Sequence, residues 1–169
     1  MLTARPEHLK TFDYLGLHQY FLTFCTHRRE RLFITADAVN TVRTQIERAS
    51  GEETVAVLAY CYMPDHLHLL AEGRADDSDC LRFIRRAKQF SGFHYKANFN
   101  RPLWQRYNYE HTLRAEEAAL SVARYIVENP LRARLVDRIE AYPFVGSSVY
   151  TLEQILEAVQ LRSGWYRSG

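Results

Sequence analysis

This sequence lacks the cysteine spacing that marks zinc ribbons and disulfide frameworks. Its three cysteines, Cys25, Cys61 and Cys80, lie far apart and form no CxxC pair. It also lacks a basic-then-apolar leader at the N-terminus, and no apolar run approaches the ~20 residues that a membrane-spanning helix needs. We therefore expect reduced thiols and a soluble, cytoplasmic protein without a membrane partner.

A strong excess of charge of one sign is also missing, because the formal net charge of the 169 residues is only +2. Any nucleic-acid surface must therefore come from local clustering of basic residues. The sequence has no internal repeat, low-complexity segment or linker. It predicts a single domain over 1–169, with its core at about 17–150 and a short C-terminal helix over 151–161.

Hydrophobic and aromatic residues make up 47% and 13% of the chain, enough for a packed core. Apolar, β-branched and aromatic runs predict strands over residues 18–26, 55–62, 66–71 and 103–112. Helical spacing of apolar residues predicts helices over 36–49, 77–97, 116–129, 131–136 and 151–161. The fold class is therefore α+β: a ferredoxin-like βαββαβ antiparallel sheet with helices packed on it, followed by C-terminal helices.

His66 and His68 lie on one of the predicted strands, directly after a Pro64-Asp65 turn. Successive side chains of a strand point to opposite faces, so the two imidazoles share one face and Leu67 lies on the other. Two imidazoles on a rigid strand can hold one metal ion between them. The alternative is a polar pair on a solvated strand face.

The second group of candidate residues is Tyr125 and Asn129, four residues apart in a predicted helix and therefore on one helical face. The amide oxygen of Asn129 is a ligand suited to Mg²⁺ or Mn²⁺. The phenol of Tyr125 can act as a covalent nucleophile. If this helix covers the histidine face, Tyr125 could attack a phosphodiester that the metal polarises. The alternatives are a core tyrosine and an asparagine that ends a helix.

A basic helix and an aromatic strand offer candidate DNA contacts. Basic side chains on the 77–97 helix either follow phosphates or form a solvated face. Aromatic side chains on the 103–112 strand either stack on unpaired bases or belong to the sheet core. The candidates are Arg82, Arg85, Arg86, Lys88, Trp104, Arg106 and Tyr107, together with Arg132 beyond the tyrosine.

Three segments together resemble the single-tyrosine HUH endonucleases, and within them the REP-associated tyrosine transposases, relatives of insertion-sequence single-strand transposases. The segments are Met63-Pro64-Asp65-His66-Leu67-His68-Leu69-Leu70, Leu103-Trp104-Gln105-Arg106 and Tyr125-Ile126-Val127-Glu128-Asn129-Pro130-Leu131-Arg132-Ala133. They occur in the family's order, and the similarity extends over about residues 17–150.

The resemblance implies metal-dependent cutting and rejoining of single-stranded DNA beside a repetitive hairpin. Tyr125 would be the nucleophile that keeps the 5′ phosphate, and His66, His68 and Asn129 would hold Mg²⁺ or Mn²⁺. A monomer with a complete site is expected, and a dimer that shares sites is the alternative. Two residues depart from the family pattern: Asp65 replaces an asparagine, and Arg134 replaces a glycine that follows Ala133.

Two other functions compete with this interpretation. A domesticated relative could bind repeat hairpins without cutting them, and its DNA binding would not depend on metal. A metal-dependent phosphodiesterase could instead use the histidine pair to activate water, in which case Tyr125→Phe would leave its activity largely intact.

Overall fold

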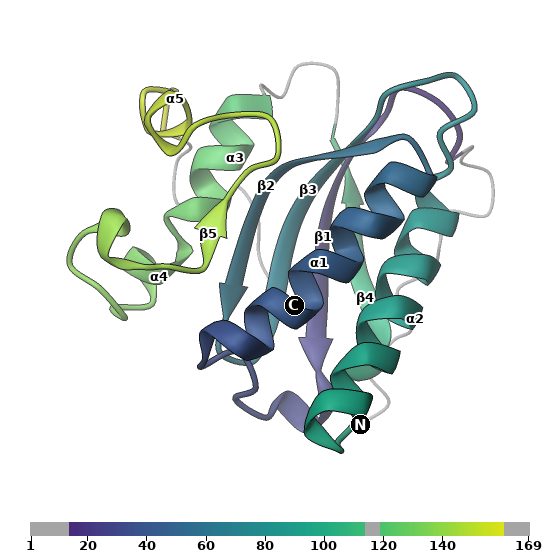
Figure 1. The fold of residues 1–169 in the computed structure, drawn as a ribbon. Helices are drawn as coiled ribbons and strands as arrows, with labels where there is room; N and C mark the ends of the chain where they lie inside the picture. Colours follow the sequence, from purple (N-terminus) through teal and green to yellow (C-terminus); the bar gives the residue numbers. More distant parts are fainter. Residues whose placement is uncertain (1–13, 114–118, 161–169) are drawn as a thin grey trace, which may run out of the picture.

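A five-stranded antiparallel sheet forms the centre of the computed structural model, which describes residues 14–113 and 119–160 (Figure 1). The strand order is β4-β1-β3-β2-β5. The strands are β1 (Gln19–Thr26), β2 (Val55–Met63), β3 (His66–Gly73), β4 (Trp104–Thr112) and β5 (Val145–Gly146). The predicted α+β class and the βαββαβ order of the first six elements are confirmed.

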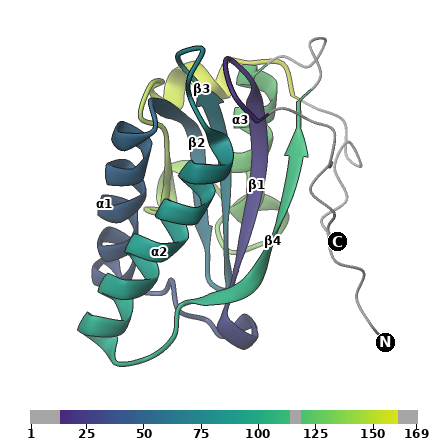
Figure 2. The same cartoon turned by 90° about the vertical axis from the view of Figure 1, so that its right-hand side faces the viewer.

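Helices cover both faces of this sheet. Figures 1 and 2 show α1 and α2 side by side on one face and α3 on the other. The helices are α1 (Ala36–Glu52), α2 (Cys80–Phe99), α3 (Ala119–Val127), α4 (Asn129–Arg132) and α5 (Leu152–Leu156). Two short 3₁₀ turns, η1 (His27–Arg29) and η2 (Ile139–Ala141), complete the described elements.

The two-residue period of the strands divides the hydrophobic core into two parts. On β3, Leu67 and Leu69 are fully buried in the layer beneath α1 and α2. The next residue, Leu70, is buried in the layer beneath α3, together with Phe21 from β1. Side chains at alternate positions therefore belong to different layers. As predicted, the leucine face of β3 packs on helices.

Two helix ends differ from the sequence prediction. Helix α1 continues through Gly51 to Glu52, and the left-handed residue that follows it is Thr54, with φ of +53°. Helix α2 begins at Cys80, three residues later than predicted, and is capped by Asp79, whose side chain accepts the Arg82 N–H at 3.0 Å. The Ser78 hydroxyl is engaged elsewhere, because it donates to the Thr54 carbonyl at 2.6 Å.

The C-terminal part contains a strand that the sequence did not predict. Strand β5 has only two residues, too few for a recognisable period, and it pairs with Tyr60 and Cys61 of β2. The final helix is shorter than predicted and ends at Leu156. It begins with a capping box in which Thr151 and Gln154 bond to each other's backbone N–H groups.

The helix that carries Tyr125 ends at Val127, two residues earlier than predicted; its predicted start, 116–118, lies outside the described residues. Pro130 has no N–H to bond to the Ile126 carbonyl, so the regular pattern breaks there. A single turn, α4, then begins at Asn129 and replaces the helix predicted over 131–136.

Arg134 ends α4 in a left-handed conformation, with φ of +56°. Its N–H bonds to the Leu131 carbonyl at 3.0 Å, and the Leu135 N–H bonds to the Pro130 carbonyl at 2.9 Å. This pair of bonds is the Schellman motif, which usually has glycine at the left-handed position. The turn that glycine would favour therefore forms with arginine in its place.

Among the described helices, none combines the length and the apolar character that crossing a membrane would require.

Arg134→Gly is expected to stabilise the fold. A left-handed residue with a Cβ costs about 1–2 kcal/mol, and the greater entropy of unfolded glycine offsets part of the gain, which leaves roughly 0.5–1 kcal/mol. Thermal unfolding should therefore shift upward by about 1–4 °C. Arg138→Gly is the control because Arg138 is extended, with φ of −137°, and it should not be stabilised. An unchanged or lower unfolding midpoint for Arg134→Gly would show that the left-handed conformation of Arg134 does not destabilise the fold.

Candidate metal and nucleophile site

His66 and His68 point to the same side of β3, with their Nε2 atoms 3.1 Å apart. Their cross-strand neighbours are Cys25 and Met63 opposite His66, and Thr23 and Cys61 opposite His68. His68 is buried, and its ring lies 5.4 Å from the ring of Phe21, which belongs to the core beneath α3. The histidines therefore occupy the α3 face of the sheet, the face on which the predicted site with Tyr125 depends.

His68 is oriented by Thr23 of the neighbouring strand. The Thr23 Oγ1 lies 2.9 Å from His68 Nδ1, which leaves Nε2 directed at His66. Burial lowers the pKa of His68 well below its ordinary value, and the positive charges near it, His66 and Arg132 first, lower the pKa further. The imidazole is therefore neutral near pH 7, the form in which histidine binds metals.

His66 is oriented by the residue before it. Asp65 Oδ1 lies 2.6 Å from His66 Nδ1, while Oδ2 accepts a hydrogen bond from Arg29 Nε at 2.9 Å. Burial raises the pKa of Asp65, but the hydrogen bond and charge of His66, together with Arg29, bring it below its ordinary value. Burial lowers the pKa of His66, and Asp65 partly opposes this effect. Asp65 thus forms the carboxylate–histidine pair common behind metal ligands.

Tyr125 and Asn129 approach the same face of the sheet from α3 and α4. Tyr125 is half-buried and packs against the core cluster that contains Phe21 and Cys61. Glu128 joins the two helices with φ of −80° and ψ of −1°, so the chain continues its right-handed turn into Asn129. Tyr125 and Asn129 therefore remain about one turn apart, although the helix that carries them is interrupted.

Arg132 packs against Tyr125 and carries its positive charge near the histidines. Its guanidinium carbon lies 3.8 Å from the centre of the Tyr125 ring, and its Nη2 donates to the Tyr125 backbone carbonyl. The same positive charge contributes to the lowered pKa of His68. Arg132 is thus stacked on the candidate nucleophile within electrostatic range of the candidate metal ligands.

The geometry of the two imidazoles fits a divalent metal ion. Ligand atoms about 2.1 Å from a metal and at right angles to each other are about 3 Å apart, close to the 3.1 Å between the two Nε2 atoms. Within the described residues, no group of three or more His, Cys, Asp or Glu side chains is arranged to hold a metal. Among the described residues, a third protein ligand would have to be of another type, such as the amide of Asn129.

The predicted basic residues of α2 lie elsewhere. This helix packs on the opposite face of the sheet, and two of its arginines form ion pairs there: Arg82 with Glu53, and Arg86 with Glu52 and Glu53. Lys88 donates to the Gln105 carbonyl at 2.9 Å. Arg85 is exposed, and no carboxylate within the described ranges pairs with it. None of these four residues belongs to the histidine site.

The aromatic strand β4 contributes mainly to the core. The Trp104 Nε1 donates to Ser91 Oγ at 2.9 Å, and its ring packs on Phe24 and Phe33, so it is not displayed for base stacking. Tyr107 is 47% exposed, and the guanidinium of Arg106 lies 5.5 Å from its ring centre. Of the two predicted stacking residues, Trp104 is partly buried and Tyr107 is therefore the more exposed.

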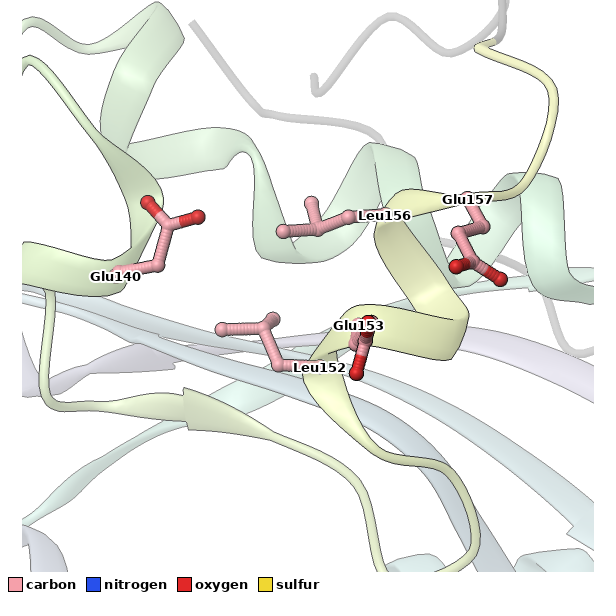
Figure 3. Close-up of a pocket in the computed structure, with 5 residues that line it drawn as sticks. All are labelled: Glu140, Leu152, Glu153, Leu156 and Glu157. Atoms are coloured by element: carbon pink, nitrogen blue, oxygen red, sulfur yellow. The ribbon is translucent and has the colours of Figure 1, made fainter.

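A surface hollow at α5 does not suit DNA (Figure 3). It is lined by Leu152, Leu156 and three carboxylates, Glu140, Glu153 and Glu157. These negative charges would repel a phosphate backbone.

Thr23 and Arg29 belong to the site, although the sequence does not mark either of them. Thr23 lies in a strand of otherwise apolar character, and only the antiparallel register with β3 places it beside His68. Arg29 was visible as one of several arginines after the first strand. Its bond to Asp65 depends on the folded loop and could not be read from spacing.

Comparison with known proteins identifies the family. The profile described as "Transposase IS200 like" matches residues 15–129, about two thirds of the chain. This chain belongs to the IS200-like transposase family. The match begins before β1 and ends at Asn129, so it includes both the histidine pair and Tyr125.

Individual relatives agree with this assignment and confirm the predicted resemblance to REP-associated tyrosine transposases. A Haemophilus influenzae protein (strain ATCC 51907 / DSM 11121 / KW20 / Rd) named as a REP-associated tyrosine transposase is 27% identical over 136 residues, covering 74% of this chain and 77% of that protein.

Two solved structures share the fold. The structure of a REP-associated tyrosine transposase bound to a REP hairpin aligns with a TM-score of 0.65 and 20% identity, covering 80% of this chain and 81% of that one. A transposase structure from Deinococcus radiodurans R1 aligns with a TM-score of 0.51 and 16% identity, covering 79% of this chain and 95% of that one.

Removing the support of His68 should weaken metal binding. We expect Thr23→Val, which keeps the side-chain shape but loses the hydroxyl, to lower Mn²⁺ affinity about 10-fold or more, because such supporting hydrogen bonds fix ring orientation. Calorimetric titration of the DNA-free protein measures this. Thr23→Ser keeps the hydroxyl and should bind Mn²⁺ like the unmodified protein. Equal affinities for Val and Ser would show that the hydroxyl does not matter.

Proposed function

We propose that this transposase cuts and rejoins single-stranded DNA beside a repetitive hairpin, through a covalent link between Tyr125 and a 5′ phosphate. The observation that supports this most strongly is the meeting of two groups on one face of the sheet. The imidazole pair comes from β3, and the stacked Tyr125–Arg132 pair comes from α3 and α4. Neither group alone would suggest phosphodiester chemistry.

The metal would be Mg²⁺ or Mn²⁺, held by His66, His68 and Asn129. When bound, such an ion supplies Lewis-acid polarisation of a phosphodiester oxygen. The chain's own residues do the remaining work. Thr23 and Asp65 fix the two imidazoles with Nε2 toward the site, and Arg29 balances the charge of Asp65.

Tyr125 would attack phosphorus with its phenolic oxygen. The new O–P bond replaces the bond to the 3′ oxygen, the phenol loses its proton to solvent, and the freed 3′ oxygen takes one up. Rejoining is the reverse reaction with a second 3′ hydroxyl. Arg132 stacks on the tyrosine ring and brings a positive charge to the place where negative charge develops.

The substrate follows from the family and from one structural neighbour. A transposase acts on DNA, and the neighbour of similar fold is bound to a REP hairpin. We infer that this chain binds a hairpin of the same kind with its single-stranded flank at the histidine face. A complete site on one chain fits action as a monomer.

Tyr125→Phe should abolish the covalent adduct. Purified protein is incubated with labelled single-stranded DNA that carries a repeat hairpin from its own genome, with Mg²⁺, with Mn²⁺ or with EDTA, and is analysed on a denaturing gel. An adduct is expected only with metal and Tyr125. Hairpin binding without an adduct in any metal would instead indicate a domesticated binding protein. Cleavage that survives Tyr125→Phe would indicate a water-activating phosphodiesterase.

Arg132→Lys should slow adduct formation at saturating DNA by about 10–100-fold, because lysine keeps the charge but loses the planar stack that positions the tyrosine. Single-turnover rates measure the effect. Arg138→Lys, also an exposed arginine of the C-terminal part, serves as the control. An unchanged rate for Arg132→Lys would remove Arg132 from the positioning of Tyr125.

A further inference from the structure

The segment after β1 contains unusual backbone strain. Arg28 and Arg29 are adjacent and both left-handed, with φ of +53° and +57°. For residues with a Cβ this conformation costs about 1–2 kcal/mol each, and it persists only where the surroundings impose it. We call residues 27–31 the arginine loop, because this segment contains Arg31 as well as Arg28 and Arg29.

Hydrogen bonds hold the arginine loop rigidly next to the candidate site. The fully buried Thr26 donates from Oγ1 to the carbonyls of Glu30 at 2.7 Å and Asp65 at 2.9 Å. The Thr26 N–H also donates to the Asp65 carbonyl at 3.0 Å, and the Phe33 N–H donates to the Pro64 carbonyl at 3.0 Å. The loop is therefore fastened to the turn that leads directly into His66.

The three arginines of this loop differ in what they contact. Arg29 is exposed, but its guanidinium bonds to Asp65 and to Cys25 Sγ. Arg28 and Arg31 are exposed, and no carboxylate in the described part of the chain pairs with either. The loop's own carboxylate, Glu30, forms an ion pair with Arg101 instead. Two cationic side chains therefore remain without an acidic partner on a rigid support.

The arginine loop adjoins the side of the sheet on which the tyrosine lies. Arg29 bonds to Asp65, whose other carboxylate oxygen lies 2.6 Å from His66 Nδ1, and to Cys25, which lies opposite His66 across the strands. Burial raises the pKa of Tyr142, and the positive charge of Arg31 partly opposes this effect, so Arg31 lies near Tyr142. The Tyr142 hydroxyl donates to the Tyr62 carbonyl at 2.6 Å, and the Tyr142 side chain packs against the core beneath α3. The basic helix α2, in contrast, lies across the opposite face with Arg82 and Arg86 already paired.

We propose that the arginine loop binds the phosphates of the single-stranded DNA that flanks the cleaved bond, with Arg28 and Arg31 as the phosphate contacts. Arg29 anchors the loop to the turn before His66. This inference rests on the proposed function for the presence of a DNA strand at the site. It assigns the strand contacts to the arginine loop and removes them from α2.

The test is DNA binding in EDTA, where no cleavage occurs. The probes are a labelled repeat hairpin with a single-stranded 5′ extension and the same hairpin without it. The double variant Arg28→Gln/Arg31→Gln should bind the extended hairpin roughly 10-fold or more weakly at 50 mM salt, and its salt dependence should fall by about 0.7 per lost contact. Its affinity for the hairpin without extension should change much less.

Two control variants test whether a loss of affinity comes only from the removed charge or from a damaged fold. Arg85→Gln removes one exposed charge from the opposite face and should bind the extended hairpin like the unmodified protein. Arg28→Gly relieves the left-handed strain, so it should unfold at the same or a higher temperature and still lose affinity. Retained affinity in Arg28→Gly or in the double variant would overturn the proposal, as would a failure of the unmodified protein to bind the extended hairpin.

The result is separable from the chemistry of Tyr125. If no phosphotyrosine adduct forms but Arg28 and Arg31 still determine binding, the proposed reaction fails and the arginine loop stands. If the adduct forms while the double variant binds like the unmodified protein, the assignment of the arginine loop fails alone.

Discussion

The alternation of side chains along β3 is the constraint on which the site depends. Leu67 and Leu69 are buried beneath α1 and α2, which fixes the register and the face of the strand. His66 and His68 must then point to the opposite side, where α3 brings Tyr125. A slip of one residue would place the imidazoles in the apolar layer beneath α1 and α2 and turn Leu67 and Leu69 toward the site. Hydrophobic packing on one face therefore determines the geometry of the polar site on the other.

Charge is distributed unevenly between the two faces. On the face covered by α1 and α2, acidic residues at the end of α1 neutralise Arg82 and Arg86. On the histidine face, Arg29 and Arg132 both lie within electrostatic range of His68, and only Arg29 has a carboxylate partner among the contacts described, Asp65. A chain with a net charge of only +2 can thus present a locally positive surface where a phosphate strand would lie.

Sequence periodicity predicted the strands, the face shared by the histidines and the helix of Tyr125, because each depends on local spacing. It could not predict β5, whose two residues carry no period, or the function of Thr23, which depends on pairing with a strand 45 residues away. It also could not predict the ion pairs that α2 makes with Glu52 and Glu53, since these form only when α1 packs beside α2. Trp104 was similarly ambiguous until its hydrogen bond to Ser91 placed it in the core.

The short strand β5 has a consequence for how the tyrosine can move. The chain that leaves α4 returns to the sheet through β5 and through the bond from Tyr142 to the Tyr62 carbonyl. Exchange of α3 with a neighbouring molecule would break both attachments and expose the apolar residues beneath α3. The return of the chain to β2 thus holds the helix of Tyr125, the proposed nucleophile, against its own sheet.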